Sequence, residues 1–198
     1  LRARTGDLEG GVLLLQEILD MDPGDHEALY QIGVLYGSPP SLQTDRALEY
    51  MNKALAINPE HPQALNYIGY SLAERGERLD EAEEMILRAL EYRPEDGYII
   101  DSLGWVYYMR ARPLLRKGRN DAANEYLEQA RKKLYRAAEL TGGDPVVSEH
   151  LGDVYLMLND KPRALQFYRE AVSLEHRAAE QPDLLNKLEG LRLELEGP

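Results

Sequence analysis

Histidine and acidic side chains are the residues of this sequence that could do chemistry, so their spacing comes first. The four histidines, His26, His61, His150 and His176, lie singly along the chain, and cysteine is absent. The absence of cysteine excludes disulfides, thiolate metal sites and cysteine nucleophiles. His26 and His61 recur at similar places before two helix-like segments, which indicates an inherited position rather than a metal pair. We therefore expect no metal and no cofactor.

Motifs of catalysis are also missing from the sequence. It contains no glycine-rich loop that could hold a phosphate and no nucleophile elbow. Adjacent acidic residues such as Glu83 and Glu84 have the pattern of a solvated helix face. A thin helical protein seldom encloses the pocket that an enzyme needs. We therefore expect a protein that is not an enzyme.

Composition and charge exclude other classes of function. The chain has 198 residues, of which 43% are hydrophobic and 29% charged, an ordinary balance for a folded protein. Its net charge of −12 should repel nucleic acid. No apolar run approaches the roughly 18–20 residues that a membrane-spanning helix needs. The sequence begins at Leu1 without a methionine, so the missing signal peptide decides little.

Four glycines mark an internal repeat, which indicates the elements that must position any site. Each glycine follows an apolar residue directly and precedes a large residue by three positions, as in IGVLY around Gly33 and LGWVY around Gly104. Offsets of three and four place such residues on one face of a helix. The four glycines are Gly33, Gly69, Gly104 and Gly152.

A second helical pattern follows three of these glycines closely, with small and large residues alternating at steps of four and three. Its members are Ala47, Met51 and Ala54, then Ala82, Ile86 and Ala89, and later Ala164, Tyr168 and Ala171. In the first two repeats the pattern ends at a proline, Pro59 or Pro94. These residues resemble the tetratricopeptide repeat (TPR). The resemblance implies an all-α fold, a right-handed superhelical solenoid of helix–turn–helix repeats with a C-terminal capping helix.

The repeat divides the chain into one solenoid domain over residues 1–198. A leucine stripe after Pro182 and Asp183 is typical of a helix that covers the end of such an array. The predicted units are the second helix of a truncated repeat over 7–24, repeats over 25–60, 61–95, 96–144 and 145–178, and the capping helix over 182–196.

The third repeat is irregular. The glycines are spaced by 36, 35 and 48 residues, and the last spacing exceeds the usual 34 by fourteen. The extra length is expected to divide evenly between the two arms of the hairpin, and Pro113 is expected to kink or interrupt the first arm. Residues 109–138 contain nine basic residues and three acidic ones. The basic residues are Arg110, Arg112, Arg116, Lys117, Arg119, Arg131, Lys132, Lys133 and Arg136.

This basic hairpin has two interpretations. It is either a solvated face attracted to acidic neighbours in the same solenoid, or a docking site for an acidic protein or an anionic lipid surface.

In TPR arrays the first helix of each hairpin lines a concave groove, and the resemblance implies a peptide or protein segment as the ligand. The groove positions here are Tyr30, Val34, Asn66, Tyr70, Tyr98, Asp101, Trp105, Tyr108, Glu149 and Asp153.

The residue types of this groove indicate what it prefers. Aromatic side chains are typical binding anchors, and Asn66 could hold a backbone amide of a bound chain. Family members that bind C-terminal carboxylates use Lys and Arg where this sequence has Asn, Asp and Glu, so that clamp is absent. We therefore expect a scaffold or adaptor that prefers a neutral or basic extended segment, or an apolar helix.

A closer resemblance concerns location. The segments 66–108 and 144–155 are similar to those of TPR lipoproteins in the proteobacterial envelope. That similarity implies the periplasmic side of the outer membrane, with a cytoplasmic location as the alternative. Membrane association is expected only through a lipid anchor N-terminal to this sequence.

Overall fold

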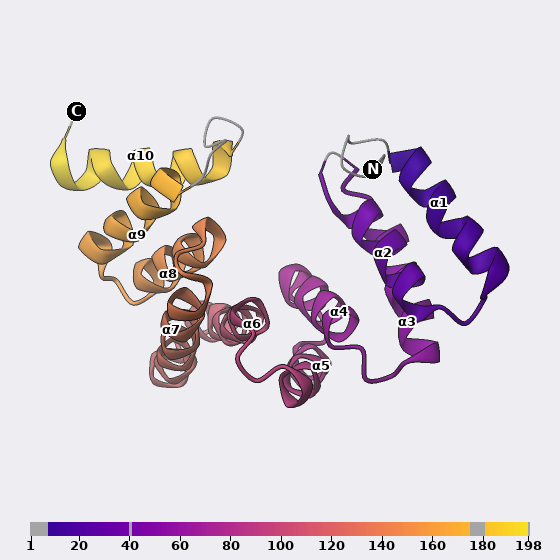
Figure 1. Ribbon diagram of the computed structural model, residues 1–198. Coiled ribbons are helices and arrows are strands. Elements are labelled where there is room, and N and C mark those ends of the chain that lie inside the picture. Colours follow the sequence, from indigo (N-terminus) through magenta and orange to yellow (C-terminus); the bar gives the residue numbers. More distant parts are fainter. Residues whose placement is uncertain (1–7, 40, 175–180, 198) are drawn as a thin grey trace.

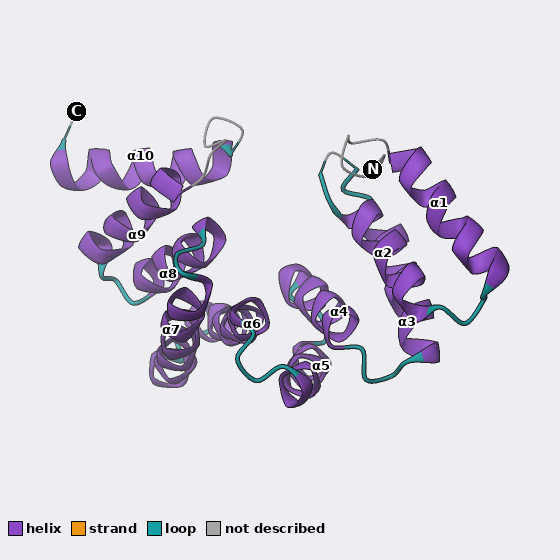
Figure 2. Ribbon diagram, in the orientation of Figure 1, coloured by secondary structure: helices purple, strands orange, loops and turns teal. Residues whose placement is uncertain are grey.

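The computed structural model describes residues 8–39, 41–174 and 181–197. Parts of three predicted units lie outside the described residues. They are residue 7 of the first unit, residue 40 of the next, and residues 175–178 of the fourth repeat, which include His176. The described residues form helices and loops and contain no strand (Figure 2). The predicted all-α solenoid is therefore confirmed.

The helices follow one another along an arc (Figure 1). The first helices of the hairpins lie on the inner side of this arc, and α10 and α1 stand at its two ends. In chain order the helices are α1 (Leu8–Met21), α2 (His26–Gly37), α3 (Thr44–Ile57), α4 (Pro62–Arg75), α5 (Leu79–Tyr92), α6 (Gly97–Arg116), α7 (Asn120–Thr141), α8 (Pro145–Met157), α9 (Lys161–Leu174) and α10 (Pro182–Glu196).

Most first helices begin with the same kind of cap. The carboxylates of Asp25, Asp96 and Asp144 accept hydrogen bonds from backbone N–H groups in the first turns of α2, α6 and α8. A side-chain acceptor there satisfies N–H groups that have no partner within the helix. In α4 the ring of His61 takes this place. Helix starts are therefore fixed by local sequence, and one of them uses an imidazole.

The repeat glycines allow the two helices of each hairpin to approach closely. A Cβ atom added to Gly69 would lie 2.7 Å from Cγ1 of Ile86 and 2.9 Å from the carbonyl oxygen of Ala82. Both distances are shorter than real contacts of this kind, so a side chain would push α5 away from α4. Ala82 and Ile86 are fully buried in this contact.

The third hairpin is longer than its neighbours. α6 has 20 residues and α7 has 22, whereas α4 and α5 have 14 each. The extension is therefore close to even, and six to eight residues lengthen a helix by roughly 10 Å. The expected interruption at Pro113 is wrong, because α6 continues through it. Pro113 lies in the last turn of α6, where the missing N–H removes only one backbone hydrogen bond.

The C-terminal helix closes the last hairpin. α10 packs against α9 through the buried side chains of Leu184 and Leu191, and it crosses the end of the array (Figure 1). Among the described residues, no helix is both long and apolar enough to cross a membrane.

Candidate binding groove

Two adjoining hollows lie on the inner side of the arc. The first, of about 520 Å³, has mostly apolar walls, and we call it the apolar hollow. The second, of about 680 Å³, has walls that are about equally polar and apolar, and we call it the polar hollow. Tyr70 and Val146 line both. The apolar hollow is lined by Tyr30, Gln63, Asn66, Tyr67, Tyr70, Asp96, Tyr98, Ile99, Asp101, Ser102, Asp144, Val146 and Val147.

The apolar hollow contains one exposed aromatic ring and one unsatisfied amide. The Tyr98 side chain is 60% exposed at the start of α6, although the hydrophobic effect favours burying such a ring. Within the described part of the chain, Oδ1 of Asn66 is buried and has no hydrogen-bond partner. An unpaired buried acceptor costs about 1–3 kcal/mol, which a donor from a ligand would recover. The apolar hollow therefore offers apolar area, and Asn66 in its wall holds an acceptor that has no partner within the protein.

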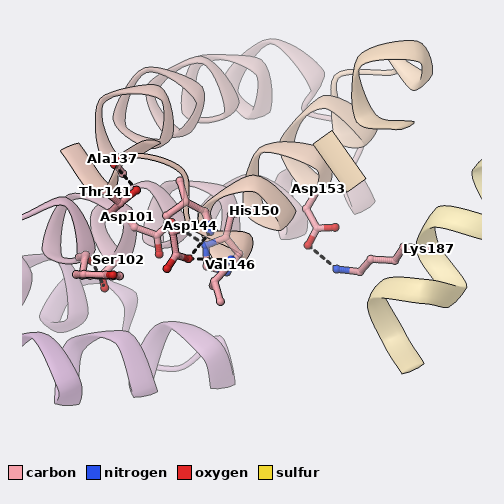
Figure 3. Close-up of polar contacts among 11 residues, drawn as sticks. Asp101, Ser102, Ala137, Thr141, Asp144, Val146, His150, Asp153 and Lys187 are labelled. Carbon is pink, nitrogen blue, oxygen red and sulfur yellow. Dashed lines mark hydrogen bonds and ion pairs between the residues drawn. The ribbon is translucent and has the colours of Figure 1, made fainter. Parts of the chain in front are cut away.

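The polar hollow lies between α8 and α10. Its charged wall contains four carboxylates and the ammonium group of Lys187. Nζ of Lys187 lies 2.7 Å from Oε1 of Glu149 and 2.8 Å from Oδ2 of Asp153, and Figure 3 shows it reaching from α10 towards Asp153. The residues that line the polar hollow are Tyr70, Glu74, Trp105, Val146, Glu149, His150, Asp153, Asp183, Asn186 and Lys187.

The carboxylates keep Lys187 charged in this position. Burial by itself lowers the pKa of Lys187, but Asp153 and Glu149 outweigh burial and raise the pKa above its ordinary value. The same Asp153 also accepts a hydrogen bond of 2.7 Å from the hydroxyl of buried Tyr168. Carboxylates still outnumber the nearby cations, so the polar hollow favours a basic group on a ligand.

A buried ion pair and a stack of rings separate the groove from the core. Nδ1 of His150 lies 2.9 Å from Oδ1 of Asp101, and both side chains are almost fully buried (Figure 3). The His150 ring stacks on Trp105 with centroids 4.0 Å apart, and Trp105 stacks on Tyr108 at 4.5 Å. Burial lowers the pKa of His150, whereas Asp101, helped by Asp153, more than compensates and raises it. This stack holds α6 against α8.

The predicted groove residues lie in different surroundings. Trp105 and Tyr108 are each only 8% exposed, so they pack between helices and are not free anchors. Asp101 and Asp153 are buried and already bound to side chains of the protein. Tyr30, Asn66, Tyr70, Tyr98 and Asp101 line the apolar hollow, and Tyr70, Trp105, Glu149 and Asp153 line the polar hollow, whereas Val34 and Tyr108 line neither.

Sequence reasoning missed two residues of the site. His150 lies in the stack, but it occurs once in the fourth repeat and has no counterpart at the equivalent position of the others. Lys187 comes from α10, which lies outside the repeat pattern. No periodicity could have predicted that this lysine meets Glu149 and Asp153.

The basic hairpin is partly neutralised by neighbouring side chains. Arg110 binds Asp80 and Glu83 at 2.7 Å each, and Arg131 binds Glu128. Arg136 is paired with Glu95 and Glu139, and the guanidinium of Arg112 contacts the sulfur of Met109. The remaining basic residues of the hairpin form no ion pair within the described part of the chain. They are Arg116, Lys117, Arg119, Lys132 and Lys133.

Comparison with known proteins is consistent with this architecture. The family model for the tetratricopeptide repeat matches residues 42–97 and 108–182. TPR repeat-containing protein PA4667 of Pseudomonas aeruginosa is 34% identical over 140 residues, which are 70% of this chain and 21% of that protein. Photosystem I assembly protein Ycf3 of Rippkaea orientalis is 37% identical over 81 residues, which are 37% of this chain and 46% of the relative. This chain thus spans less than half the length of either protein.

A solved structure shows the same fold. The thermophilic TPR protein TTC0263 of Thermus thermophilus superimposes with a TM-score of 0.70 at 24% identity, covering 87% of this chain and 84% of that one. At this identity the likeness concerns the fold alone.

Proposed function

This chain belongs to the tetratricopeptide repeat family, and we propose that it is a scaffold or adaptor that binds an extended protein segment in its concave groove. The fold supports protein–protein interaction in general, and proteins of this family are typically non-enzymatic scaffolds. The observation that carries the proposal is the apolar hollow, which is lined by both the exposed Tyr98 and Asn66 with its unsatisfied Oδ1.

The chemistry of the two hollows indicates the kind of segment. An apolar or aromatic side chain would cover Tyr98 and Tyr30 in the apolar hollow, and a backbone N–H of the same segment would donate to Asn66. A basic side chain would then meet Glu74 and Asp183 in the polar hollow. We therefore propose a neutral or basic segment, bound in extended form because only an extended backbone leaves its N–H groups free.

The experiment is a selection of random displayed peptides against the chain, followed by measurement of Kd by fluorescence polarisation. Tyr98→Ala and Asn66→Ala are each expected to weaken selected peptides tenfold or more, as groove anchors do. Tyr92→Ala is the matched control, because Tyr92 is an exposed tyrosine on α5 that lines neither hollow. Peptides that bind both groove variants as tightly as the unchanged chain would refute the proposal.

A second candidate function is docking through the basic hairpin. Arg116 and Lys117 are exposed at the tip of the hairpin and form no ion pair with any described residue. An acidic protein or an anionic lipid surface is the fitting partner. Reversal of both residues to Glu is expected to abolish binding to vesicles that contain anionic phospholipid at low salt, while leaving peptide binding unchanged. Vesicle binding that survives the reversal argues against docking at this tip.

We also propose that the protein works at the periplasmic side of the outer membrane, reached through a lipid anchor outside this sequence. The support is the similarity of segments 66–108 and 144–155 to envelope TPR lipoproteins. Cell fractionation of the full-length protein tests it. Recovery in the cytoplasmic fraction would favour the alternative location.

A further inference from the structure

Three side chains that could hold a metal ion meet at the start of two neighbouring repeats. His26 and Glu27 are the first two residues of α2, and His61 is the N-cap of α4. One ligand atom from each residue lies within 4.8 Å of those from the other two. Nε2 of His61 lies 3.4 Å from Oε2 of Glu27, and the two imidazole rings meet edge to face with centroids 5.4 Å apart.

The spacing of these atoms suits a small cation. Metal–nitrogen and metal–oxygen bonds of zinc are about 2.0–2.2 Å long, so two ligand atoms at tetrahedral positions are roughly 3.4 Å apart. The separation of His61 Nε2 from Glu27 Oε2 already has this value. The ring of His26 needs to move by roughly 1 Å to complete the set, given the same bond lengths.

The hydrogen bonding of His26 is incomplete without a ligand. Among the described residues, its buried Nδ1 has no hydrogen-bond partner, and its Nε2 has only a contact of 3.5 Å with Nδ2 of Asn58. Buried polar atoms are normally paired, so an unpaired ring nitrogen indicates a missing partner. A metal ion bound at Nδ1 would supply that partner.

The ring of His61 changes its hydrogen bonding when a metal ion binds. Nδ1 of His61 accepts a long hydrogen bond of 3.4 Å from the N–H of Ala64. Binding a cation at Nε2 moves the ring proton to Nδ1 and gives up this bond. The loss is small beside a metal–nitrogen bond, because the capping bond is at the limit of its length.

Ligand type selects the metal. Two imidazoles and one carboxylate suit Zn²⁺ and its neighbours Co²⁺, Ni²⁺ and Cu²⁺, whereas Mg²⁺ and Ca²⁺ prefer oxygen ligands alone. Three protein ligands leave a fourth position for water or for a group of a partner. Contrary to the expectation from the sequence, we propose that His26, Glu27 and His61 form a Zn²⁺ site that links the start of α2 to the start of α4.

The site adjoins the groove without being part of it. The ring of Tyr30, which lines the apolar hollow, packs against His61 with centroids 4.7 Å apart. A bound ion fixes His61 and thereby the neighbouring wall of the hollow. The two first helices that it joins otherwise contact each other mainly through α3. Zn²⁺ is therefore expected to stabilise the stacking of the first two complete repeats.

The experiment is a calorimetric titration of chelator-treated, tag-free protein with Zn²⁺, accompanied by thermal melts with and without the metal. One ion is expected to bind per chain and to raise Tm, because it binds the folded state only. His26→Gln, Glu27→Gln and His61→Asn should each weaken binding at least tenfold, since even the loss of a supporting residue costs that much. Asn is itself a good N-cap, so His61→Asn keeps the start of α4.

The control is Glu84→Gln, which removes an exposed carboxylate of α5 far from the cluster. Unchanged Zn²⁺ affinity in both histidine variants, or no saturable binding to the unchanged chain, would overturn the proposal. If circular dichroism shows that a histidine variant does not fold, the visible absorption of Co²⁺ bound to the unchanged chain tests the proposal instead. Intense bands indicate a four-coordinate site with imidazole ligands, and their absence refutes it.

Discussion

Asp101 in α6 and His150 in α8 are 49 positions apart, yet Oδ1 of one lies 2.9 Å from Nδ1 of the other inside the protein. The pair closes the floor of the groove and holds Trp105 in a stack with the imidazole. A charged pair in such a place is costly to bury, but breaking it leaves one charge without a partner. The pair therefore couples the third and fourth repeats, and it depends on pH.

The first prediction concerns that pH dependence. The pKa of His150 is raised in the folded state, so its pairing with Asp101 stabilises the protein below the ordinary histidine pKa of about 6.5. This stability is lost as the pH rises through the folded pKa. In Asp101→Asn, the free energy of unfolding should fall less between about pH 6 and pH 8 than in the unchanged chain. Urea denaturation at the two values measures both slopes.

His61 changes the free energy of unfolding with pH in the opposite direction. The pH dependence must therefore be compared between Asp101→Asn and the unchanged chain. The pKa of His61 is lowered by burial, and its contribution to stability is therefore present above the ordinary histidine value and is lost as the pH falls from there through the lowered folded pKa. Asp101→Asn leaves His61 untouched, and the difference between the two proteins isolates His150. Identical slopes in the two proteins would contradict a charged pair.

The second prediction separates folding from binding at the aromatic residues. Trp105→Ala removes a ring that is 8% exposed and stacked on both sides, and it should lower the free energy of unfolding by about 3–5 kcal/mol. Tyr98→Ala removes an exposed ring and should change stability by less than about 0.5 kcal/mol. Denaturant melts of the two variants measure both losses. Equal losses in the free energy of unfolding would refute the conclusion that Trp105 is part of the groove wall and Tyr98 is a binding anchor.

The third prediction uses two helical glycines in different surroundings. Gly69→Ala brings a Cβ atom against Ile86 and the backbone of Ala82, and overpacking of this kind should destabilise the protein by about 1–3 kcal/mol. A Cβ atom added to Gly190 meets nothing within 4 Å, so Gly190→Ala should stabilise α10 by about 0.5–1 kcal/mol through helix propensity. Opposite shifts in Tm are therefore expected. Tm shifts of the same sign in the two variants would show that the contact between α4 and α5 at Gly69 does not determine the change in stability.

The fourth prediction concerns the attachment of α10. Lys187→Met removes an ammonium group that joins Glu149 and Asp153, and its partly exposed position limits the loss to about 1 kcal/mol. Hydrogen exchange of α10 should become faster, because the helix then loses the ion pairs that join it to α8. Lys132→Met is the matched control, since Lys132 is an exposed lysine with no ion pair among the described residues. Equal exchange of α10 in both variants would contradict the anchoring role.

The sequence predicted the fold well because the signals that it carries are local and repeated. A glycine such as Gly69 is needed where the two helices of a hairpin approach this closely, and small residues such as Ala82 follow from the same contact. Both recur at a fixed spacing, so they can be recognised without coordinates. The interruption at Pro113 was wrongly expected because the effect of a proline depends on its distance from the end of the helix, which the pattern does not define.

The candidate site was harder to predict. Periodicity places Trp105 on the first helix of the third repeat, but it does not say how much of the ring the neighbouring repeat covers. The structure stacks His150 on that ring and thereby changes an expected anchor into part of the wall. Exposed Tyr98 is the better anchor, because it lies at the start of α6, beyond this cover.

The sequence by itself therefore determined the helices, their pairing into hairpins and the extra length of the third one, since these depend on neighbours three, four or about 34 positions away. The tertiary structure decided which groups from different repeats meet. Asp101 with His150, His26 with His61, and Lys187 with Asp153 each join helices whose relative placement comes from the stacking of repeats. Stacking is the sum of many small packing contacts, and no single spacing in the chain records it.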